Sequence, residues 1–289
     1  MTRLALGTVQ FGQRYGVANA TGQVSAESAA HILTLARRSG MDTLDTAIAY
    51  GSSEQCLGEI GVAQWRVISK LPPLPDGVTD VAQWAEVQVL ASLKRLRVQQ
   101  LDALLLHRPA DLLGPRAQEV IAALDAIEAR GWARSVGISV YSPGDLDAVF
   151  ATWVPQIVQA PCNILDRRLI RSGWLARLAQ RGVRVHIRSV LLQGLLLLSA
   201  TQRPEWFLRW SGLLDRWLQW CCDCAVTPLQ AALAFAQALP DIERIVIGVD
   251  SLAHLDEILS AADGTGSLPP EDLYSEDPDL LDPSRWKLT

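Results

Sequence analysis

The stretch TLDTAIAYGSSEQCLGEIGV, residues 43–62, places a short strand pattern directly before a helical one. Its first five residues are mostly apolar or β-branched, which is typical of a short buried strand ending near the acid Asp45. Helical spacing of apolar residues follows, and Ser52 or Ser53 together with the next acid is expected to cap that helix. The stretch therefore predicts one strand and one helix, with Asp45 and Tyr50 lying between them.

The same alternation of strand and helix patterns runs along the chain. The predicted strands are residues 4–9, 43–47, 66–70, 101–107, 135–140, 157–163, 183–190 and 243–249. The predicted helices are residues 26–39, 53–62, 80–97, 116–130, 144–151, 168–181, 227–238 and 251–262, and several stop at a glycine. Eight such units indicate a closed α/β fold, the (β/α)8 TIM barrel, which takes about 250 residues. A doubly wound open sheet is the rival, but it usually has fewer strands and a glycine-rich first turn.

No linker rich in Pro, Gly or Ser interrupts the alternation, so we expect a single barrel domain over residues 1–262. Residues 263–289 lack periodicity and predict an irregular C-terminal tail that packs on the barrel through its leucines and Trp286. The Trp-rich stretch 204–224 keeps roughly helical spacing of its tryptophans. Core packing is the favoured interpretation of that stretch, and a substrate wall or a dimer face are the alternatives.

Composition excludes several classes of function. Of the 289 residues 49% are hydrophobic, which indicates a large core, and the net charge of -5 offers no general attraction to nucleic acid or an anionic membrane. The first residues lack a signal-peptide pattern, and no stretch reaches 18 uninterrupted apolar residues. Five cysteines without framework spacing suggest a reducing cytoplasm. We expect a cytoplasmic protein, a monomer or weak homo-oligomer, with no nucleic-acid or membrane partner.

Two kinds of chemistry are not expected. The cluster CCDC, residues 221–224, has no second cluster or nearby histidine to complete a metal site, so its cysteines are expected on a buried helix face. The chain also lacks G-x-G-x-x-G after the first strand, G-x-x-x-x-G-K-[ST], H-E-x-x-H and G-x-S-x-G. A Rossmann site, a P-loop, a zinc protease and a serine hydrolase are therefore not indicated.

Ionisable residues end three consecutive predicted strands. Asp45 ends the second strand and Tyr50 follows it, Lys70 ends the third and His107 ends the fourth. In a TIM barrel these C-terminal strand ends carry catalysis. Each residue alone has an ordinary interpretation, as a cap, a packing side chain, an exposed strand end or a core histidine. Together they predict convergence at one mouth.

The four side chains suit one reaction. A lysine about 4 Å from a tyrosine supplies roughly 4 kcal/mol at an effective dielectric of 20, which would lower the tyrosine pKa from near 10. An aspartate would hold the lysine charged, and a neutral histidine could donate a hydrogen bond to a carbonyl oxygen. Tyrosine as general acid on that oxygen, with hydride arriving at carbon, is carbonyl reduction.

These residues resemble the aldo-keto reductase family. The stretch DTAIAYGSSEQCLG (45–58) is similar to its D-T-A-x-x-Y-G-x-[ST]-E-x-x-[LI]-G signature, and SLKRLRVQQLDALLLHRP (92–109) to its helix-then-histidine segment. LGTVQFG (6–12), ISKLP (68–72), VGISVYSP (136–143), IVQAPCNILDRR (157–168), RSVLLQGLLL (188–197) and RIVIGVDSLAHLDEIL (244–259) extend the resemblance in order over nearly the whole chain. The resemblance implies that Asp45, Tyr50, Lys70 and His107 match the catalytic tetrad, with Tyr50 as proton donor.

The resemblance also implies a nicotinamide cofactor extended across the barrel mouth. The matching positions are Ser139 and Gln159 at the carboxamide, Arg188 where many members stack an aromatic on the nicotinamide, Ser189, Val190 and Gln193 along the pyrophosphate, and Gly248, Val249, Asp250, His254 and Glu257 at the adenosine end. Val140 stands where many members have Asn, Ile258 where an Asn is common, and residues 248–258 contain no Lys or Arg for a 2′-phosphate. The resemblance still favours NADP as the cofactor, and NAD is the alternative.

Three functions are weighed. The first is NAD(P)H-dependent reduction, or reverse oxidation, of a small carbonyl compound or sugar, without a metal. The second is an aldolase-type enzyme that uses Lys70 as a Schiff-base nucleophile, which leaves Tyr50 unexplained. The third is a non-catalytic, cofactor-sensing auxiliary subunit.

Overall fold

A computed structural model describes residues 2–19, 21–262 and 268–288. Its eight strands are all parallel and form a closed barrel in chain order, because the first strand also pairs with the last. The strands are β1 (Leu4–Gly7), β2 (Thr43–Asp45), β3 (Arg66–Leu71), β4 (Ala103–Leu106), β5 (Val136–Ser139), β6 (Ile157–Pro161), β7 (Arg184–Arg188) and β8 (Arg244–Gly248). The predicted (β/α)8 barrel is confirmed.

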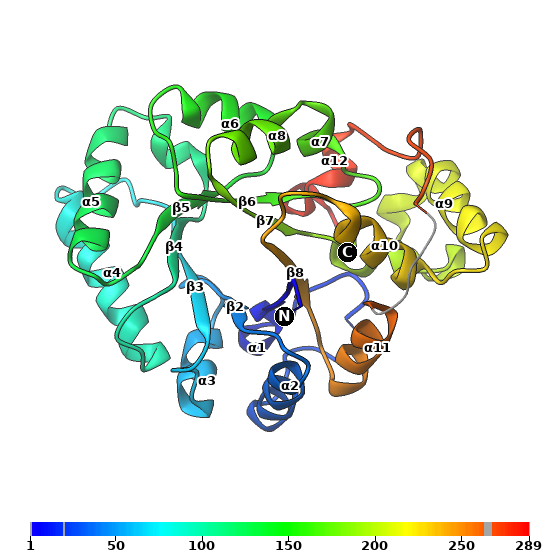
Figure 1. Cartoon of the computed structure of the whole chain (residues 1–289), viewed down its shortest axis with the longest axis horizontal. Coiled ribbons are helices and arrows are strands. Elements are labelled where there is room, and N and C mark those ends of the chain that lie inside the picture. The colour runs from blue at the N-terminus through cyan, green and yellow to red at the C-terminus, as the bar shows by residue number, and fades with distance from the viewer. Residues whose placement is uncertain (1, 20, 263–267, 289) are drawn as a thin grey trace.

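Helices surround the strands (Figure 1). The α-helices are α1 (Val9–Gly12), α2 (Ala26–Arg38), α3 (Ser53–Ile60), α4 (Val81–Leu96), α5 (Ala117–Ala129), α6 (Pro143–Phe150), α7 (Arg168–Arg171), α8 (Trp174–Gln180), α9 (Ser211–Asp223), α10 (Pro228–Ala238), α11 (Leu252–Ala262) and α12 (Pro278–Leu281). Short 3-10 helices are η1 (Pro109–Leu112), η2 (Leu192–Leu197), η3 (Ala200–Gln202), η4 (Glu205–Trp210) and η5 (Pro283–Arg285). The helix predicted over 168–181 is divided, because Gly173 between α7 and α8 has a φ of +78°.

Local sequence signals explain where most helices begin and end. The side chains of Asp80 and Ser142 accept hydrogen bonds from backbone N–H groups in the first turns of α4 and α6. Gly40, Gly131 and Gly182 follow α2, α5 and α8 with positive φ, so the predicted glycine stops are confirmed. These short connections return each helix to the start of the next strand.

The interior of the barrel is layered. Side chains alternate between the two faces of a strand, so residues two apart on β3 point into the barrel at successive depths. Arg66 lies at its N-terminal end, Ile68 in its middle and Lys70 near its C-terminal end. Ile68 packs with Ala103, Leu105 and Ile157 in a small buried cluster. An apolar layer therefore separates charged groups at the two ends of the barrel.

Charged side chains close the N-terminal end of the barrel. Arg66 forms ion pairs with Asp102 and Glu243, at 3.1 Å each, and Arg184 forms ion pairs with the same two acids at 2.9 and 2.6 Å. The buried His186 lies 3.3 Å from Glu243. The two guanidinium groups lower the pKa of Asp102, and His186 together with Arg184 lowers that of Glu243, against the opposing effect of burial. This end of the barrel is a structural ion network, distant from the predicted site.

The C-terminal segments pack on the barrel. Leu273, Leu280 and Leu281 are buried, and the Trp286 ring lies 4.8 Å from that of Phe207 in an edge-to-face contact. The predicted division between residues 262 and 263 stays a prediction, since residues 263–267 lie outside those described. In the part of the chain that is described, no helix is long and apolar enough to cross a membrane.

The Trp-rich stretch forms η4 and α9, so its helical spacing is confirmed for most of its length. Trp217 is fully buried, donates to the Leu196 carbonyl oxygen at 2.9 Å and stacks on Trp220. Trp206 and Trp210 are partly buried and pack against the core. Core packing is the interpretation that these contacts favour.

Candidate active site

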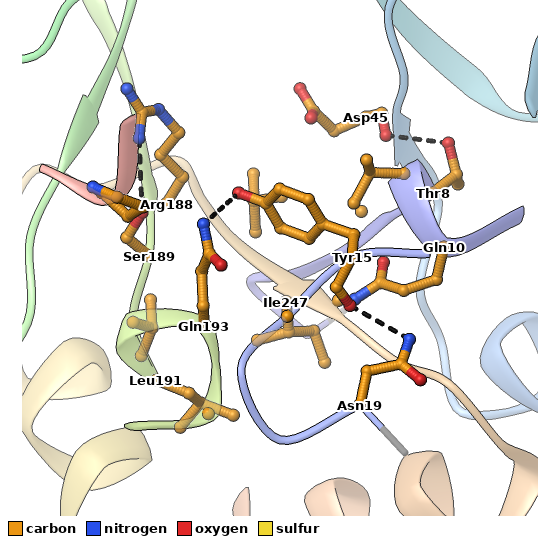
Figure 2. Close-up of a pocket in the computed structure, with 18 of the residues that line it drawn as sticks. Thr8, Gln10, Tyr15, Asn19, Asp45, Arg188, Ser189, Leu191, Gln193 and Ile247 are labelled. Atoms are coloured by element: carbon orange, nitrogen blue, oxygen red, sulfur yellow. Dashed lines mark hydrogen bonds between the residues drawn. The ribbon is translucent and has the colours of Figure 1, made fainter. Parts of the chain in front are cut away.

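One cavity of about 380 Å³ opens at the C-terminal ends of the strands. Its lining comes from the loops after most strands and from the tail. Figure 2 shows part of this lining, including residues of the loops after β1 and β7. The described lining residues with polar side chains are Thr8, Gln10, Tyr15, Asn19, Asp45, Tyr50, His107, Ser139, Tyr141, Gln159, Arg188, Ser189, Gln193, Asp250, His254 and Ser284. Three of the four predicted catalytic residues are among them, and the fourth, Lys70, lies directly behind Asp45.

Asp45 is the centre of a buried polar cluster. Its Oδ2 accepts a hydrogen bond from Lys70 Nζ at 2.7 Å, and its Oδ1 accepts one from Gln159 Nε2 at 2.6 Å. Lys70 is only 1% exposed and also donates to the Thr46 carbonyl oxygen at 2.9 Å. Burial lowers the pKa of Lys70, and the Asp45 carboxylate opposes that effect. Removal of either partner would leave an unpaired buried charge, so the pair is firmly held.

Tyr50 and His107 lie together in front of this pair. Their rings meet edge to face with centroids 5.7 Å apart, and Lys70 Nζ lies 5.1 Å from the centroid of the Tyr50 ring. Burial lowers the pKa of His107 to about 4, and the charges of Lys70 and Arg188 act in the same direction. His107 is therefore neutral near pH 7, and a neutral imidazole can still donate the predicted hydrogen bond from one ring nitrogen.

The predicted lowering of the Tyr50 pKa by Lys70 is wrong for this structure. Burial raises the pKa of Tyr50 above its ordinary value of 10, the Asp45 carboxylate raises it further, and Arg188 is the cation that opposes them. The physical reason is that Asp45 neutralises Lys70, whose Nζ donates to Asp45 and lies 5.1 Å from the centroid of the Tyr50 ring. Tyr50 is consequently protonated at neutral pH.

Close backbone packing fixes the turn that carries Tyr50. A Cβ at Gly12 would lie 1.7 Å from the Tyr50 carbonyl oxygen, and one at Gly51 would lie 2.4 Å from the Gly12 carbonyl oxygen. Only glycine permits this approach between the loop after β1 and the loop after β2. The first loop therefore helps to position the tyrosine, although it is distant in sequence.

The predicted start of α3 at Ser52 or Ser53 is confirmed, but the side-chain cap expected there is not formed. Ser52 is the N-cap residue but makes no side-chain cap, and the Ser53 hydroxyl donates instead to the Thr8 carbonyl oxygen at 2.8 Å. The following acid, Glu54, is buried and accepts hydrogen bonds from Ser69, Ser92 and Arg95. Tertiary contacts replaced the local cap because this end of α3 is buried between β3 and α4.

Most residues predicted to bind the cofactor line the cavity. These are Ser139, Gln159, Arg188, Ser189, Val190, Gln193, Gly248, Asp250 and His254. Val249 is fully buried and Glu257 is exposed on α11, and the structure brings neither of them to the cavity lining. Val249 points into the core because it alternates with Gly248 and Asp250 along the chain. Glu257 lies further along α11 than His254, and its side chain is exposed to solvent.

Arg188 lies between the catalytic residues and the loop after β7. Its guanidinium donates to the Val140 carbonyl oxygen at 3.0 Å and to the Ser189 hydroxyl at 3.3 Å, and it lies 4.7 Å from the centroid of the Tyr141 ring. A planar guanidinium close to an aromatic ring can also stack on a ligand. Arg188 is the single Lys or Arg among the described residues that line the cavity.

Two buried amides fit a ligand that carries hydrogen-bond donors. Gln159 Oε1 and Gln10 Oε1 are buried and have no hydrogen-bond partner among the described residues. Both residues line the cavity, and an unsatisfied buried acceptor is costly unless a bound group supplies a donor. A nicotinamide carboxamide at Gln159 and ribose hydroxyls near Gln10 would supply such donors. The residues present therefore fit the cofactor that the resemblance implies.

Several lining residues were missed or left undecided by sequence reasoning. Gln10, Asn19, Tyr141 and Ser284 were not predicted, and Tyr15 was considered only as a residue of the first loop. Figure 2 shows Tyr15 and Gln193 reaching toward each other from the loops after β1 and β7, joined by a 2.9 Å hydrogen bond. Loop conformation decides such positions, and the only available signal was the polarity of residues 9–24.

The cysteine cluster takes no part in this cavity. Cys221 is buried, but Cys222 is exposed and Cys224 is intermediate, so the expected buried face holds for one cysteine alone. Within residues 2–19, 21–262 and 268–288, no group of three or more His, Cys, Asp or Glu side chains is arranged to hold a metal ion.

Comparisons with known proteins agree with this geometry. Among solved structures, the aldo-keto reductase AKR11C1 from Bacillus halodurans in its holo form is similar with a TM-score of 0.74, at 22% identity over 92% of this chain and 88% of that chain. A putative aldo-keto reductase from Pseudomonas aeruginosa is similar with a TM-score of 0.66, at 23% identity over 90% of this chain and 89% of that chain. At these identities the likeness shows the fold alone.

Sequence comparisons add the family. A 6-dehydroglucose reductase from Agrobacterium fabrum (strain C58 / ATCC 33970) is 33% identical over 99 residues, which span 34% of this chain and 33% of that protein. The aligned region thus covers about one third of the curated relative. A sequence model of the Aldo/keto reductase family matches residues 3–273, nearly the whole chain. With its closed barrel and its tetrad-like cluster at the C-terminal mouth, this chain belongs to the aldo/keto reductase family.

Proposed function

We propose that this chain catalyses NAD(P)H-dependent reduction, or the reverse oxidation, of a small carbonyl compound or sugar, with Tyr50 as the general acid. The observation that carries the proposal is the joint placement of a protonated tyrosine and a neutral histidine at one cavity, in front of the buried Asp45–Lys70 pair. Family membership supplies the reaction class, which is carbonyl reduction with a nicotinamide cofactor.

In this proposal each residue of the site has a separate role. The bound cofactor supplies the hydride. Neutral His107 donates a hydrogen bond to the carbonyl oxygen and positions it beside Tyr50, whose hydroxyl then gives up its proton to that oxygen. Arg188, the cation that opposes the raised pKa of Tyr50, would stabilise the phenolate that remains, and Asp45 and Lys70 form the buried pair behind the ring. Ser139, Gln159 and Arg188 would hold the nicotinamide end.

The alternatives are weaker on geometry. A Schiff-base role requires that Lys70 reach a substrate, yet Lys70 is 1% exposed, donates to Asp45 and Thr46, and is not part of the cavity lining. Borohydride trapping with substrate would reveal such an adduct. A cofactor-sensing role would leave cofactor binding without turnover.

Replacement of Tyr50 by Phe tests the proposal. We expect turnover to fall by about 10²- to 10⁴-fold, the usual contribution of a general acid, while cofactor affinity stays nearly unchanged. Turnover is measured with a panel of aldehydes, ketones and oxidised sugars, and the relative named a 6-dehydroglucose reductase makes an oxidised hexose a reasonable first member. Wild-type turnover in Tyr50→Phe would overturn the assignment.

Family resemblance favours NADP as the cofactor, but the charges that line the cavity oppose it.

A further inference from the structure

The charged groups of the cavity are unevenly distributed. Arg188 lies on β7 beside the catalytic residues, where its charge affects the pKa values of both Tyr50 and His107. The lining beyond the end of β8 contributes Asp250 and His254. No other Lys or Arg lines the described part of the cavity. A ligand that extends from Tyr50 to the β8 side therefore meets a carboxylate there, without a guanidinium or ammonium group.

Asp250 is held in place by its neighbours on α11. Its Oδ1 lies 3.2 Å from His254 Nδ1, one helical turn along, and both side chains are one quarter exposed. The His254 backbone N–H donates to the Ser251 hydroxyl at 3.1 Å, which fixes the start of the helix. A carboxylate at a helix N-terminus is itself stabilised by the helix dipole, and its negative charge opposes the binding of a phosphate at the start of α11.

Gln10 provides a second acceptor on the same side. It packs against β8 so closely that a Cβ at Gly248 would lie 2.6 Å from its Nε2 and 3.0 Å from its Oε1. The side chain is 92% buried, and its Oε1 has no partner among the described residues. Asp250 follows Gly248 by two residues, and both Gln10 and Asp250 line the cavity, so two acceptors lie on its β8 side. Acceptors require donors, and a ribose diol supplies them, whereas a phosphate dianion does not.

We infer that Asp250 selects NAD(H) over NADP(H) in this chain, by accepting a ribose hydroxyl and repelling a 2′-phosphate. The inference rests on the proposed function, since it concerns the cofactor of the same reaction. It opposes the NADP preference that family resemblance suggests. Its physical basis is the sign of the charge: a phosphate dianion is disfavoured beside the Asp250 carboxylate, whose nearest partner is the imidazole of His254 and not a Lys or Arg side chain.

The test is a comparison of NADH and NADPH affinities by quenching of the fluorescence of the ten tryptophans, with calorimetry as a second readout. We expect the wild type to bind NADH about tenfold or more tighter than NADPH. Asp250→Asn keeps an acceptor but removes the charge, so NADPH affinity should rise about three- to tenfold while NADH affinity changes little. Asp250→Arg should reverse the preference, with NADPH binding that weakens at high salt.

Asp256→Asn is the matched control. It removes one negative charge from an exposed position on the same helix, outside the cavity lining, and should leave the affinity ratio unchanged. Equal or tighter NADPH binding by the wild type would overturn the inference while leaving the reductase proposal intact. The inference would also be overturned if the ratio of NADH to NADPH affinity in Asp250→Asn equalled that of the wild type. Failure of both cofactors to bind would instead overturn the proposed function.

Discussion

Glu54 offers a quantitative test of how α3 is attached to the barrel. Its Oε1 accepts hydrogen bonds from Ser69 at 2.6 Å and Ser92 at 2.7 Å, and its Oε2 accepts two from Arg95, at 2.8 and 2.6 Å. In Glu54→Gln the amide oxygen can still face the two hydroxyls. The amide nitrogen, however, would face the Arg95 donors, so two charge-assisted bonds are lost.

The expected loss of unfolding free energy is about 3 kcal/mol. Hydrogen bonds to charged groups contribute roughly 1.5–3 kcal/mol each, and breaking a buried ion pair costs about 3–5 kcal/mol. The expected loss lies at the lower end of these ranges, because the Arg95 side chain is 36% exposed and water can partly replace the lost carboxylate. If Glu54 acted only on the helix dipole, as an acid in the first turn of α3, the loss would be about 0.3–1 kcal/mol.

Urea unfolding monitored by circular dichroism separates the two values. Glu59→Gln is the control, because Glu59 lies on the same helix but is exposed, and its loss should stay within about 0.5 kcal/mol. A double-mutant cycle with Arg95→Met should give a coupling energy of about 1–3 kcal/mol. A loss in Glu54→Gln below about 1 kcal/mol, or equal to that of Glu59→Gln, would refute the network argument.

Two further predictions concern the tyrosine and its neighbour. The pKa of His107 is lowered to about 4 in the folded chain, against about 6.5 when unfolded, so the unfolded state binds the proton first as the pH falls. The folded state therefore loses stability between pH 6.5 and 4. In urea titrations, the free energy of unfolding of His107→Gln should fall by about 2 kcal/mol less than that of the wild type between pH 7 and pH 5. An identical acid loss in both proteins would count against the neutral histidine. Gly12→Ala would place a Cβ 1.7 Å from the Tyr50 carbonyl oxygen, so it should displace the tyrosine and lower turnover by about tenfold or more, or destabilise the chain. Gly114→Ala is the control, because nothing lies within 4 Å of the added Cβ, and it should change neither activity nor stability. Normal activity and stability in Gly12→Ala would contradict the packing.

Sequence reasoning succeeded where a pattern depends on the chain's own periodicity. All eight strands lie at the predicted places, because a parallel barrel buries both faces of each strand and its helices carry one apolar face. The strand-end residues Asp45, Lys70 and His107 were predictable for the same reason, since the topology brings the C-terminal strand ends to one mouth. Gly40, Gly131 and Gly182 were predictable because a helix stop requires only local geometry.

Contacts between distant segments were not predictable in this way. Glu54 resembles a helix-capping acid in sequence, yet its partners Ser92 and Arg95 are about 40 residues away. The pairing of Tyr15 with Gln193 depends on two loops whose conformations have no periodic signal. The ion network around Arg184 was missed because charged residues at strand starts have the pattern of exposed ends, although here they point into the barrel.

The assignment of the proton donor follows from placement as much as from residue type. Among the four clustered residues, Asp45 acts only as an acceptor, and its partner Lys70 cannot leave it without exposing a buried charge to an apolar layer. Near neutral pH His107 can donate a hydrogen bond but has no excess proton, because its pKa is lowered to about 4. Tyr50 lines the cavity and stays protonated, because burial and Asp45 raise its pKa. The raised pKa therefore keeps the proton on Tyr50 but makes its hydroxyl a weaker acid, so proton transfer in reduction depends on the negative charge that develops on the carbonyl oxygen, and the reverse oxidation, which requires the phenolate, is expected to need high pH.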